Sequence, residues 1–222
     1  MLIAIDGPAA SGKSSVARGL ATRLGCRHVN SGALYRLVTS RVLSQGFPIE
    51  EPGPLEIAVN ALPFQAIPEP GGVSFLVGDT PPVYPIDAPE VNAAVSTVAA
   101  YPFVRTRVNE VLRACSTFGP AVVEGRDIGS VVFPDAVFKF FLDASPEVRQ
   151  LRRGRQGLVD SVVVRDRADQ TRATAPLCAA PDAVVIDTSH MAIDAVVEAI
   201  VAEIQKHPLS REFFSLEGSL EP

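Results

Sequence analysis

The chain has 222 residues, 47% of them hydrophobic and 20% charged, with a formal net charge of -5. This length and composition suit one compact α/β domain with small inserts. An acidic chain lacks the broad basic surface that collects nucleic-acid phosphates, so we expect no nucleic-acid partner. Three scattered cysteines without a C-x-x-C pair predict neither a zinc site nor a disulfide framework. We find no basic leader and no run long enough to span a membrane, and therefore expect a cytoplasmic protein.

The first elements in chain order are an apolar strand at 3–6, a glycine-rich loop and a helix from Ser15 to about Leu24. The loop reads G-x-x-x-x-G-K-S from Gly7 to Ser14. Strand, loop and helix in this order are typical of a phosphate-binding P-loop, although a glycine-rich turn that carries a lysine by chance is the alternative.

The chemistry of this loop favours a nucleoside triphosphate with Mg²⁺. Glycines let the backbone curl so that its N–H groups point at an anion, and the helix N-terminus adds partial positive charge. Lys13 would sit on the outer phosphates, and the Ser14 hydroxyl can ligate Mg²⁺. We expect the phosphates of this nucleotide, which the resemblance described below implies to be ATP, to be held by Gly7, Pro8, Ala9, Ala10, Ser11, Gly12, Lys13, Ser14 and Ser15.

The remaining pattern predicts an α/β fold with a five-stranded parallel sheet. The five strands are expected at 3–6, 27–30, 120–124, 137–142 and 183–187. Helices are expected at 31–45, 55–61, 89–100, 103–116, 149–155, 160–171 and 192–206. Strand-like runs at 64–67 and 73–77 predict a small antiparallel sheet inserted at about 63–85.

Three segments that follow predicted strands should crowd one rim of that sheet, because ligands of parallel sheets bind beyond the carboxyl ends of the strands. They are the P-loop, residues 30–32 and residues 124–127. Glu124 ends a buried strand, where it could face Mg²⁺ through water or be a solvated strand end. Arg126 and Asp127 lie between two glycines, which favours a loop held close to a ligand over a surface ion pair.

For the cationic residues elsewhere in the chain, the sequence pattern allows two interpretations. Arg36 would point toward the same rim or lie on a helix surface. Arg165, Asp169 and Arg172 share one helical face, which is either a solvated face or a lid whose arginines cover transferring phosphates. Arg152 and Arg153 could join such a lid. The three histidines lie in unrelated contexts, and we assign them no catalytic role.

Taken together, these motifs resemble the bacterial cytidylate kinases of the nucleoside monophosphate kinase superfamily. The matching segments run in family order across nearly the whole chain: 7–14, 31–36, 90–96, 125–129 with 132–136, 140–144 and 165–177. The runs from 125 to 136 and from 31 to 36 are the most specific. The resemblance implies a three-layer P-loop kinase fold with a β-rich nucleotide-binding insert and a short helical lid.

The resemblance also implies roles for individual residues. It places Mg²⁺ near Ser14 and Glu124, and it implies that Lys13, Arg126, Arg165 and Arg172 act on the phosphates. The acceptor nucleotide would be contacted by Ser31, Arg36, Ser96, Arg105, Arg126, Asp127, Arg165, Asp169 and Arg172. Of these, Asp127 could accept the cytosine amino group while Arg105 and Ser96 face its ring nitrogen and carbonyl, which would disfavour UMP.

Some positions depart from the family pattern. Asp87 stands where an arginine is common, Glu124 replaces the more usual Asp, and Ala168 and Gln170 occupy positions that often carry arginine. The segment between Arg155 and Arg165 is shortened, so we expect a trimmed lid. These departures bear on lid closure and on charge neutralisation at the ATP side.

We therefore expect ATP-dependent phosphorylation of CMP and dCMP by a monomer with a single kinase domain. Its core would comprise 1–35, 115–150 and 173–206, the nucleotide-binding insert about 36–114, the lid about 151–172, and a peripheral tail 207–222. Another small-molecule kinase, of shikimate or gluconate type, remains an alternative. A nucleotide-binding protein without transferase activity is a second one.

Overall fold

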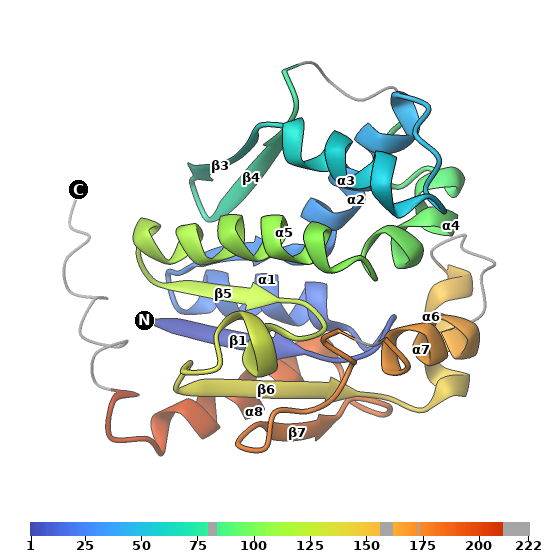
Figure 1. The fold of residues 1–222 in the computed structure, drawn as a ribbon. Helices are drawn as coiled ribbons and strands as arrows, with labels where there is room; N and C mark the ends of the chain where they lie inside the picture. Colours follow the sequence, from blue (N-terminus) through green and yellow to red (C-terminus); the bar gives the residue numbers. More distant parts are fainter. Residues whose placement is uncertain (80–83, 156–161, 173, 211–222) are drawn as a thin grey trace.

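Three layers make up the molecule, with a sheet between two sets of helices (Figure 1). The computed structural model describes residues 1–79, 84–155, 162–172 and 174–210, without the side chains of Val162 and Arg165. The expected tail beyond residue 210, and the shortened part of the lid at 156–161, lie outside the described residues. Within the described ranges, no helix is both long enough and apolar enough to cross a membrane.

The sheet has seven strands in the order β3-β4-β2-β5-β1-β6-β7. Their bounds are Leu2–Asp6 (β1), Arg27–Asn30 (β2), Phe64–Glu69 (β3), Gly72–Val77 (β4), Ala121–Glu124 (β5), Phe138–Asp143 (β6) and Val184–Asp187 (β7). The five predicted parallel strands are β1, β2, β5, β6 and β7, which pair with one another in parallel.

The expected count of five strands is wrong, because the hairpin of β3 and β4 does not form a separate small sheet. β4 lies parallel to β2 at the register pair His28–Gly72, and β3 pairs antiparallel with β4. The N–H of His28 donates to the carbonyl of Gly71 at 3.0 Å. The hairpin thus covers the otherwise open edge of β2 and satisfies its backbone groups.

The helices are α1 to α8, and their bounds match the predicted ones to within a few residues. They span Lys13–Arg23 (α1), Ser31–Ser44 (α2), Pro52–Ala61 (α3), Pro89–Val98 (α4), Pro102–Ala114 (α5), Pro146–Arg155 (α6), Val162–Gln170 (α7) and Ile193–Gln205 (α8). A 3₁₀ turn at Cys115–Phe118 and a π-helical turn at Ile128–Val132 were not expected from the pattern.

Alternation along β1 shows how the core is divided. Ile3 and Ile5 face the cluster formed with α1 and α8, whereas Ala4 faces the cluster formed with α2, α3 and α5. All three side chains are fully buried. A parallel strand that is covered on both faces needs such a continuous apolar run, and this is why the first strand carries no polar residue before Asp6.

The P-loop begins where β1 ends, and its glycines are required by geometry. A Cβ on Gly7 would lie 2.0 Å from the carbonyl oxygen of Leu142, and Gly12 caps α1 with a φ of +94°. Only glycine enters such contacts and dihedrals without strain. In Figure 1 the arrowheads of β1, β5 and β6 point toward α6 and α7, so the predicted rim faces these two helices.

Candidate active site

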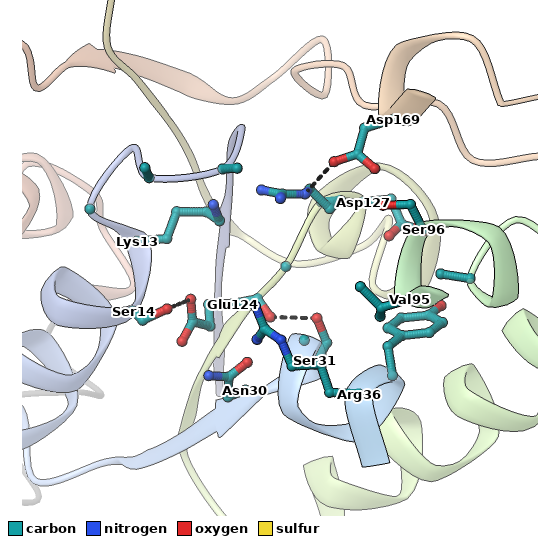
Figure 2. A pocket seen from close by; sticks show the side chains of 18 of the residues that line it. Lys13, Ser14, Asn30, Ser31, Arg36, Val95, Ser96, Glu124, Asp127 and Asp169 are labelled. Carbon is teal, nitrogen blue, oxygen red and sulfur yellow. Dashed lines mark hydrogen bonds and ion pairs between the residues drawn. The ribbon is translucent and has the colours of Figure 1, made fainter. Parts of the chain in front are cut away.

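A cavity of about 230 Å³ lies at the carboxyl ends of the strands. In Figure 2, Lys13 and Ser14 stand on one side, Val95 and Ser96 on the other, and Glu124 between them. The residues named from the sequence that line it are Ala9, Ala10, Gly12, Lys13, Ser14, Ser15, Ser31, Arg36, Ser96, Arg105, Glu124, Arg126, Asp127, Asp169 and Arg172. Segments from five parts of the chain therefore meet at one site.

Three of the nine predicted P-loop residues do not line this cavity. Gly7 and Pro8 turn their carbonyl groups to Arg126 and Lys13, respectively. Ser11 is fully buried, and its carbonyl accepts a hydrogen bond from the Thr188 hydroxyl at 2.8 Å. These residues hold the loop in place through their backbone carbonyl groups and are not part of the cavity lining.

The ammonium group of Lys13 is held inside the curl of the loop. Its Nζ donates to the carbonyl of Pro8 at 2.6 Å, and only 8% of the residue is exposed. Burial, with the nearby charge of Arg126, holds the pKa of Lys13 well below its ordinary value. A phosphate placed beside it would add negative charge and favour the charged form of this buried group.

Ser14 and Glu124 bring two hard oxygen donors together. The Ser14 hydroxyl donates to Oε2 of Glu124 at 2.7 Å, and Glu124 is 3% exposed. No group of three or more His, Cys, Asp or Glu side chains suited to a metal occurs in the described part of the chain. A hydroxyl and a carboxylate fit Mg²⁺, which typically keeps several waters and takes its other ligands from substrate phosphates.

Across the cavity, Arg105 and Asp127 form a buried ion pair. Arg105 also donates to the carbonyl of Ala99 at 3.1 Å, and its guanidinium lies 5.4 Å from the ring centroid of Tyr35. Both members of the pair are at most 3% exposed. The pair presents one fixed acceptor and one fixed cation to the cavity, and Ser96 on α4 lies beside it (Figure 2).

Arg126 connects the P-loop with α7. Its Nη1 donates to the carbonyl of Gly7 at 2.6 Å, and its Nε forms an ion pair with Asp169 at 2.8 Å (Figure 2). Asp169 also pairs with Arg172, just beyond the end of α7. The side chain of Arg165, the remaining predicted cation, lies outside the described residues.

The loop that carries Arg126 and Asp127 is fixed from β1. Oδ1 of Asp6 accepts the N–H of Ile128 and Oδ2 accepts that of Gly129, each at 2.7 Å. Burial raises the pKa of Asp6 to about 6, against the lowering effect of these two hydrogen bonds. Asp6 directly precedes the P-loop, so one residue sets the spacing between the two halves of the site.

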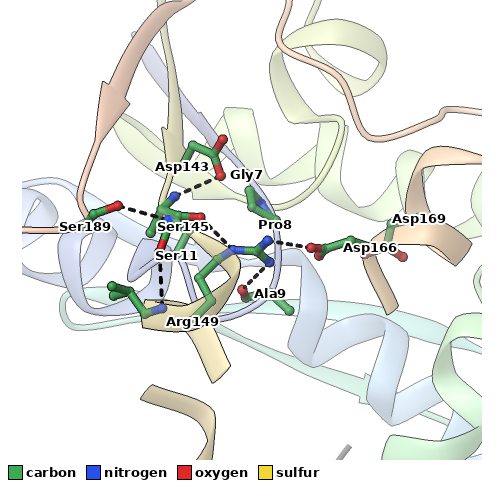
Figure 3. A network of polar contacts seen from close by, with 12 residues as sticks. Gly7, Pro8, Ala9, Ser11, Asp143, Ser145, Arg149, Asp166, Asp169 and Ser189 are labelled. Atoms are coloured by element: carbon green, nitrogen blue, oxygen red, sulfur yellow. Dashed lines mark hydrogen bonds and ion pairs between the residues drawn. The ribbon is translucent and has the colours of Figure 1, made fainter. Parts of the chain in front are cut away.

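Figure 3 shows a second link from the P-loop, which sequence reasoning missed. Nη1 of Arg149 on α6 donates to the carbonyl of Ala9 at 3.3 Å, and Nη2 pairs with Asp166 on α7 at 2.6 Å. Arg149 is 5% exposed, so this cation has a structural role, in which it joins the P-loop to α7. In the sequence, the arginine-rich run of α6 is the feature that could have indicated this link.

The cavity also has lining residues that were not named as site residues. They are Asn30, Gly32, Tyr35, Val95, Ala99, Gly125 and Arg153. Asn30 and Gly32 belong to a segment expected at the rim, and Arg153 to one expected to join a lid. Tyr35 on α2, Val95 on α4 and Ala99 just after α4 belong to no polar sequence pattern that would have revealed them.

Taken together, the strand-loop-helix phosphate cradle, the paired hydroxyl and carboxylate, and the arginines across from them define a P-loop phosphotransferase. One solved structure, titled a sugar kinase from Janibacter sp., is similar over 94% of this chain and 96% of its own, with a TM-score of 0.50 and 15% sequence identity. At that identity the likeness concerns the fold alone.

Sequence comparisons identify the family. The family described as Cytidylate kinase matches residues 3–206. A cytidylate kinase from Mycobacterium avium is 43% identical, covering 89% of this chain and 92% of its own. One from Pelotomaculum thermopropionicum is 42% identical, covering 91% and 95%, and one from Streptomyces avermitilis is 37% identical, covering 93% of each. The chain belongs to the cytidylate kinase family.

Proposed function

We propose that this chain transfers the γ-phosphoryl group of ATP to the 5′-phosphate of CMP and dCMP, giving CDP or dCDP and ADP. Family membership supports this reaction, as does the division of the cavity into a P-loop side and an arginine-rich side. The P-loop would hold the donor and the opposite wall the acceptor.

The observation that carries the choice of base is the buried pair of Arg105 and Asp127 beside Ser96. Asp127 offers an acceptor for the exocyclic amino group of cytosine, and Arg105 and Ser96 offer donors for its ring nitrogen and carbonyl. Uracil has a carbonyl where cytosine has the amino group, so it would set one acceptor against another. That mismatch in a buried site is costly, and we expect poor use of UMP.

The transfer step requires positioning and charge neutralisation rather than a general base. A nucleoside monophosphate is already largely ionised at neutral pH, because its second pKa is about 6. We assign the grip on the acceptor phosphate to Arg36, Arg126 and Arg172, and that on the outer ATP phosphates to Lys13. Mg²⁺, when bound near Ser14 and Glu124, would neutralise charge on the donor phosphates.

Closure over the substrates completes the proposal. We assign residues of about 36–114 to an acceptor-binding insert and about 151–172 to a lid, which exclude water that would otherwise accept the phosphoryl group. Arg165 would act from that lid. We further propose that the enzyme acts as a monomer in the cytoplasm and without a nucleic-acid or membrane partner.

Steady-state ADP release with CMP, dCMP, UMP, AMP, shikimate and gluconate as acceptors tests the proposal. We expect CMP and dCMP to give the highest kcat/KM and UMP to fall well below them. Turnover with shikimate or gluconate in place of CMP would assign a different kinase. ATP binding without turnover on any acceptor would favour a binding protein.

A further inference from the structure

Glu124 has a partner on each of its two carboxylate oxygens. Oε2 accepts the hydroxyl of Ser14 at 2.7 Å, and Oε1 lies 3.0 Å from Nε2 of His28. The side chains of Glu124 and His28 are only 4% and 12% exposed. The contact to His28 has no part in the assignments made above.

Strand register explains why a residue so distant in sequence reaches Glu124. β2 and β5 are adjacent parallel strands, in which His28 pairs with Val122 and Asn30 with Glu124. Side chains two positions apart point to the same face of a sheet, so His28 and Glu124 are diagonal neighbours on one face. The imidazole reaches along the strand toward the cavity and stops at the carboxylate.

We infer that His28 is a positioning residue, which holds the Glu124 carboxylate in the orientation that Mg²⁺ binding requires. The inference rests on the proposed function, because it assumes that Mg²⁺ and a nucleotide bind here. A carboxylate accepts hydrogen bonds, so this contact assigns an N–H to Nε2 of the imidazole, which donates a hydrogen bond to Oε1. Partners of this kind fix the direction of carboxylates that bind metals.

The length of the side chain at position 124 explains why such a partner is needed. Glutamate has one more rotatable bond than aspartate, so its carboxylate is less constrained by the backbone. Ser14 alone holds one oxygen of that carboxylate, and the Ser14 hydroxyl would leave Glu124 if it turned to the metal. The hydrogen bond from His28 keeps the carboxylate fixed whether the Ser14 hydroxyl contacts Glu124 or the metal. His28 belongs to β2 rather than to the P-loop, so it does not move with Ser14.

Three substitutions at one position separate this role from a general effect on packing. His28→Leu removes the donor. His28→Gln keeps an amide nitrogen close to the place of Nε2, whereas His28→Asn carries the same amide on a side chain too short to reach Oε1. The readout is Mn²⁺ binding in the presence of ADP, followed by electron paramagnetic resonance, which requires no turnover.

We expect His28→Leu and His28→Asn to weaken Mn²⁺ binding about tenfold, and His28→Gln to retain most of the wild-type affinity. Melting temperatures measured without metal show which variants are folded. If His28→Leu does not fold, the Mn²⁺ affinities of His28→Gln and His28→Asn still test whether a donor close to Oε1 is required. Equal affinity in all folded variants would overturn the inference, and so would an equal loss in Gln and Asn.

A double substitution tests independently whether His28 acts through Glu124. In a Glu124→Ala background, His28→Leu should cause no further loss of Mn²⁺ affinity, since the group it positions is gone. A further tenfold loss there would show that His28 acts by another route. Failure of the wild-type chain to phosphorylate CMP would refute the proposed function separately, because the Mn²⁺ measurement needs no acceptor.

Discussion

Replacing Asp6 by Asn should remove a pH-dependent contribution to the free energy of unfolding. The carboxyl group is buried, and its pKa is raised from 3.8 to about 6. The folded protein therefore binds this proton more tightly than the unfolded chain does. The contribution is fully present below the unfolded pKa and is lost as the pH rises through about 6.

The difference between the two pKa values sets the size of the effect at about 3 kcal/mol. The free energy of unfolding of the wild type minus that of Asp6→Asn should therefore fall by about 2.5 kcal/mol between about pH 4 and pH 7, because the unfolded chain is already partly ionised at pH 4. Chemical denaturation followed by circular dichroism measures this difference, and it avoids fluorescence in a chain that has no tryptophan.

Asp135→Asn is the matched control, because it removes one carboxylate from an exposed position of the same chain. We expect the control to change the free energy of unfolding by no more than about 0.5 kcal/mol at any pH. A wild-type minus Asp6→Asn difference that stays constant across the pH range would refute the account of Asp6 as a carboxyl whose pKa is raised by burial.

Three further substitutions test the site. Lys13→Ala should lower kcat/KM for CMP by about 100-fold or more, because it removes the cation placed against the donor phosphates; near-normal turnover would refute this role. Asp127→Asn should lower kcat/KM for CMP by about 10- to 100-fold and raise the ratio of UMP to CMP use, since its amide can donate to a carbonyl; an unchanged ratio would contradict the base assignment. Gly125→Ala should lower the free energy of unfolding by about 1–3 kcal/mol in denaturation experiments, because its Cβ would lie 2.6 Å from the Ser31 hydroxyl oxygen. Gly154→Ala in α6 is its control, since nothing lies within 4 Å of the added carbon, and a loss as large in the control would contradict the steric explanation.

Local pattern was sufficient for much of the fold. The spacing from Gly7 to Ser14 predicts its loop because the positive φ values of Gly7 and Gly12 are properties of single residues. The apolar run of β1 and the helical periodicity of α8 depend on side chains a few positions apart. Such signals can be detected in a single sequence because residues close together along the chain produce them.

The edge of the sheet could not be predicted in the same way. The hairpin of β3 and β4 has a clear antiparallel pattern, but its junction with β2 depends on one register pair, His28 with Gly72. Backbone hydrogen bonds carry no sequence signature, so nothing in either segment indicated that they would meet. The contacts of Arg149 with Ala9 and Asp166 were missed as well, because each joins Arg149 to a separate element whose approach a linear pattern does not contain.

The sequence by itself determined that a phosphate cradle follows the first strand, and that an arginine and an aspartate follow the third predicted strand. It also indicated, through the resemblance, which residues would face the acceptor. Only the tertiary structure decided how these segments are joined: Asp6 to the amides of 128 and 129, Arg126 to Gly7, and His28 to Glu124. These partners lie 96 to 123 positions apart. Their contacts exist because adjacent parallel strands bring their carboxyl ends to one edge, and a linear pattern does not contain that proximity.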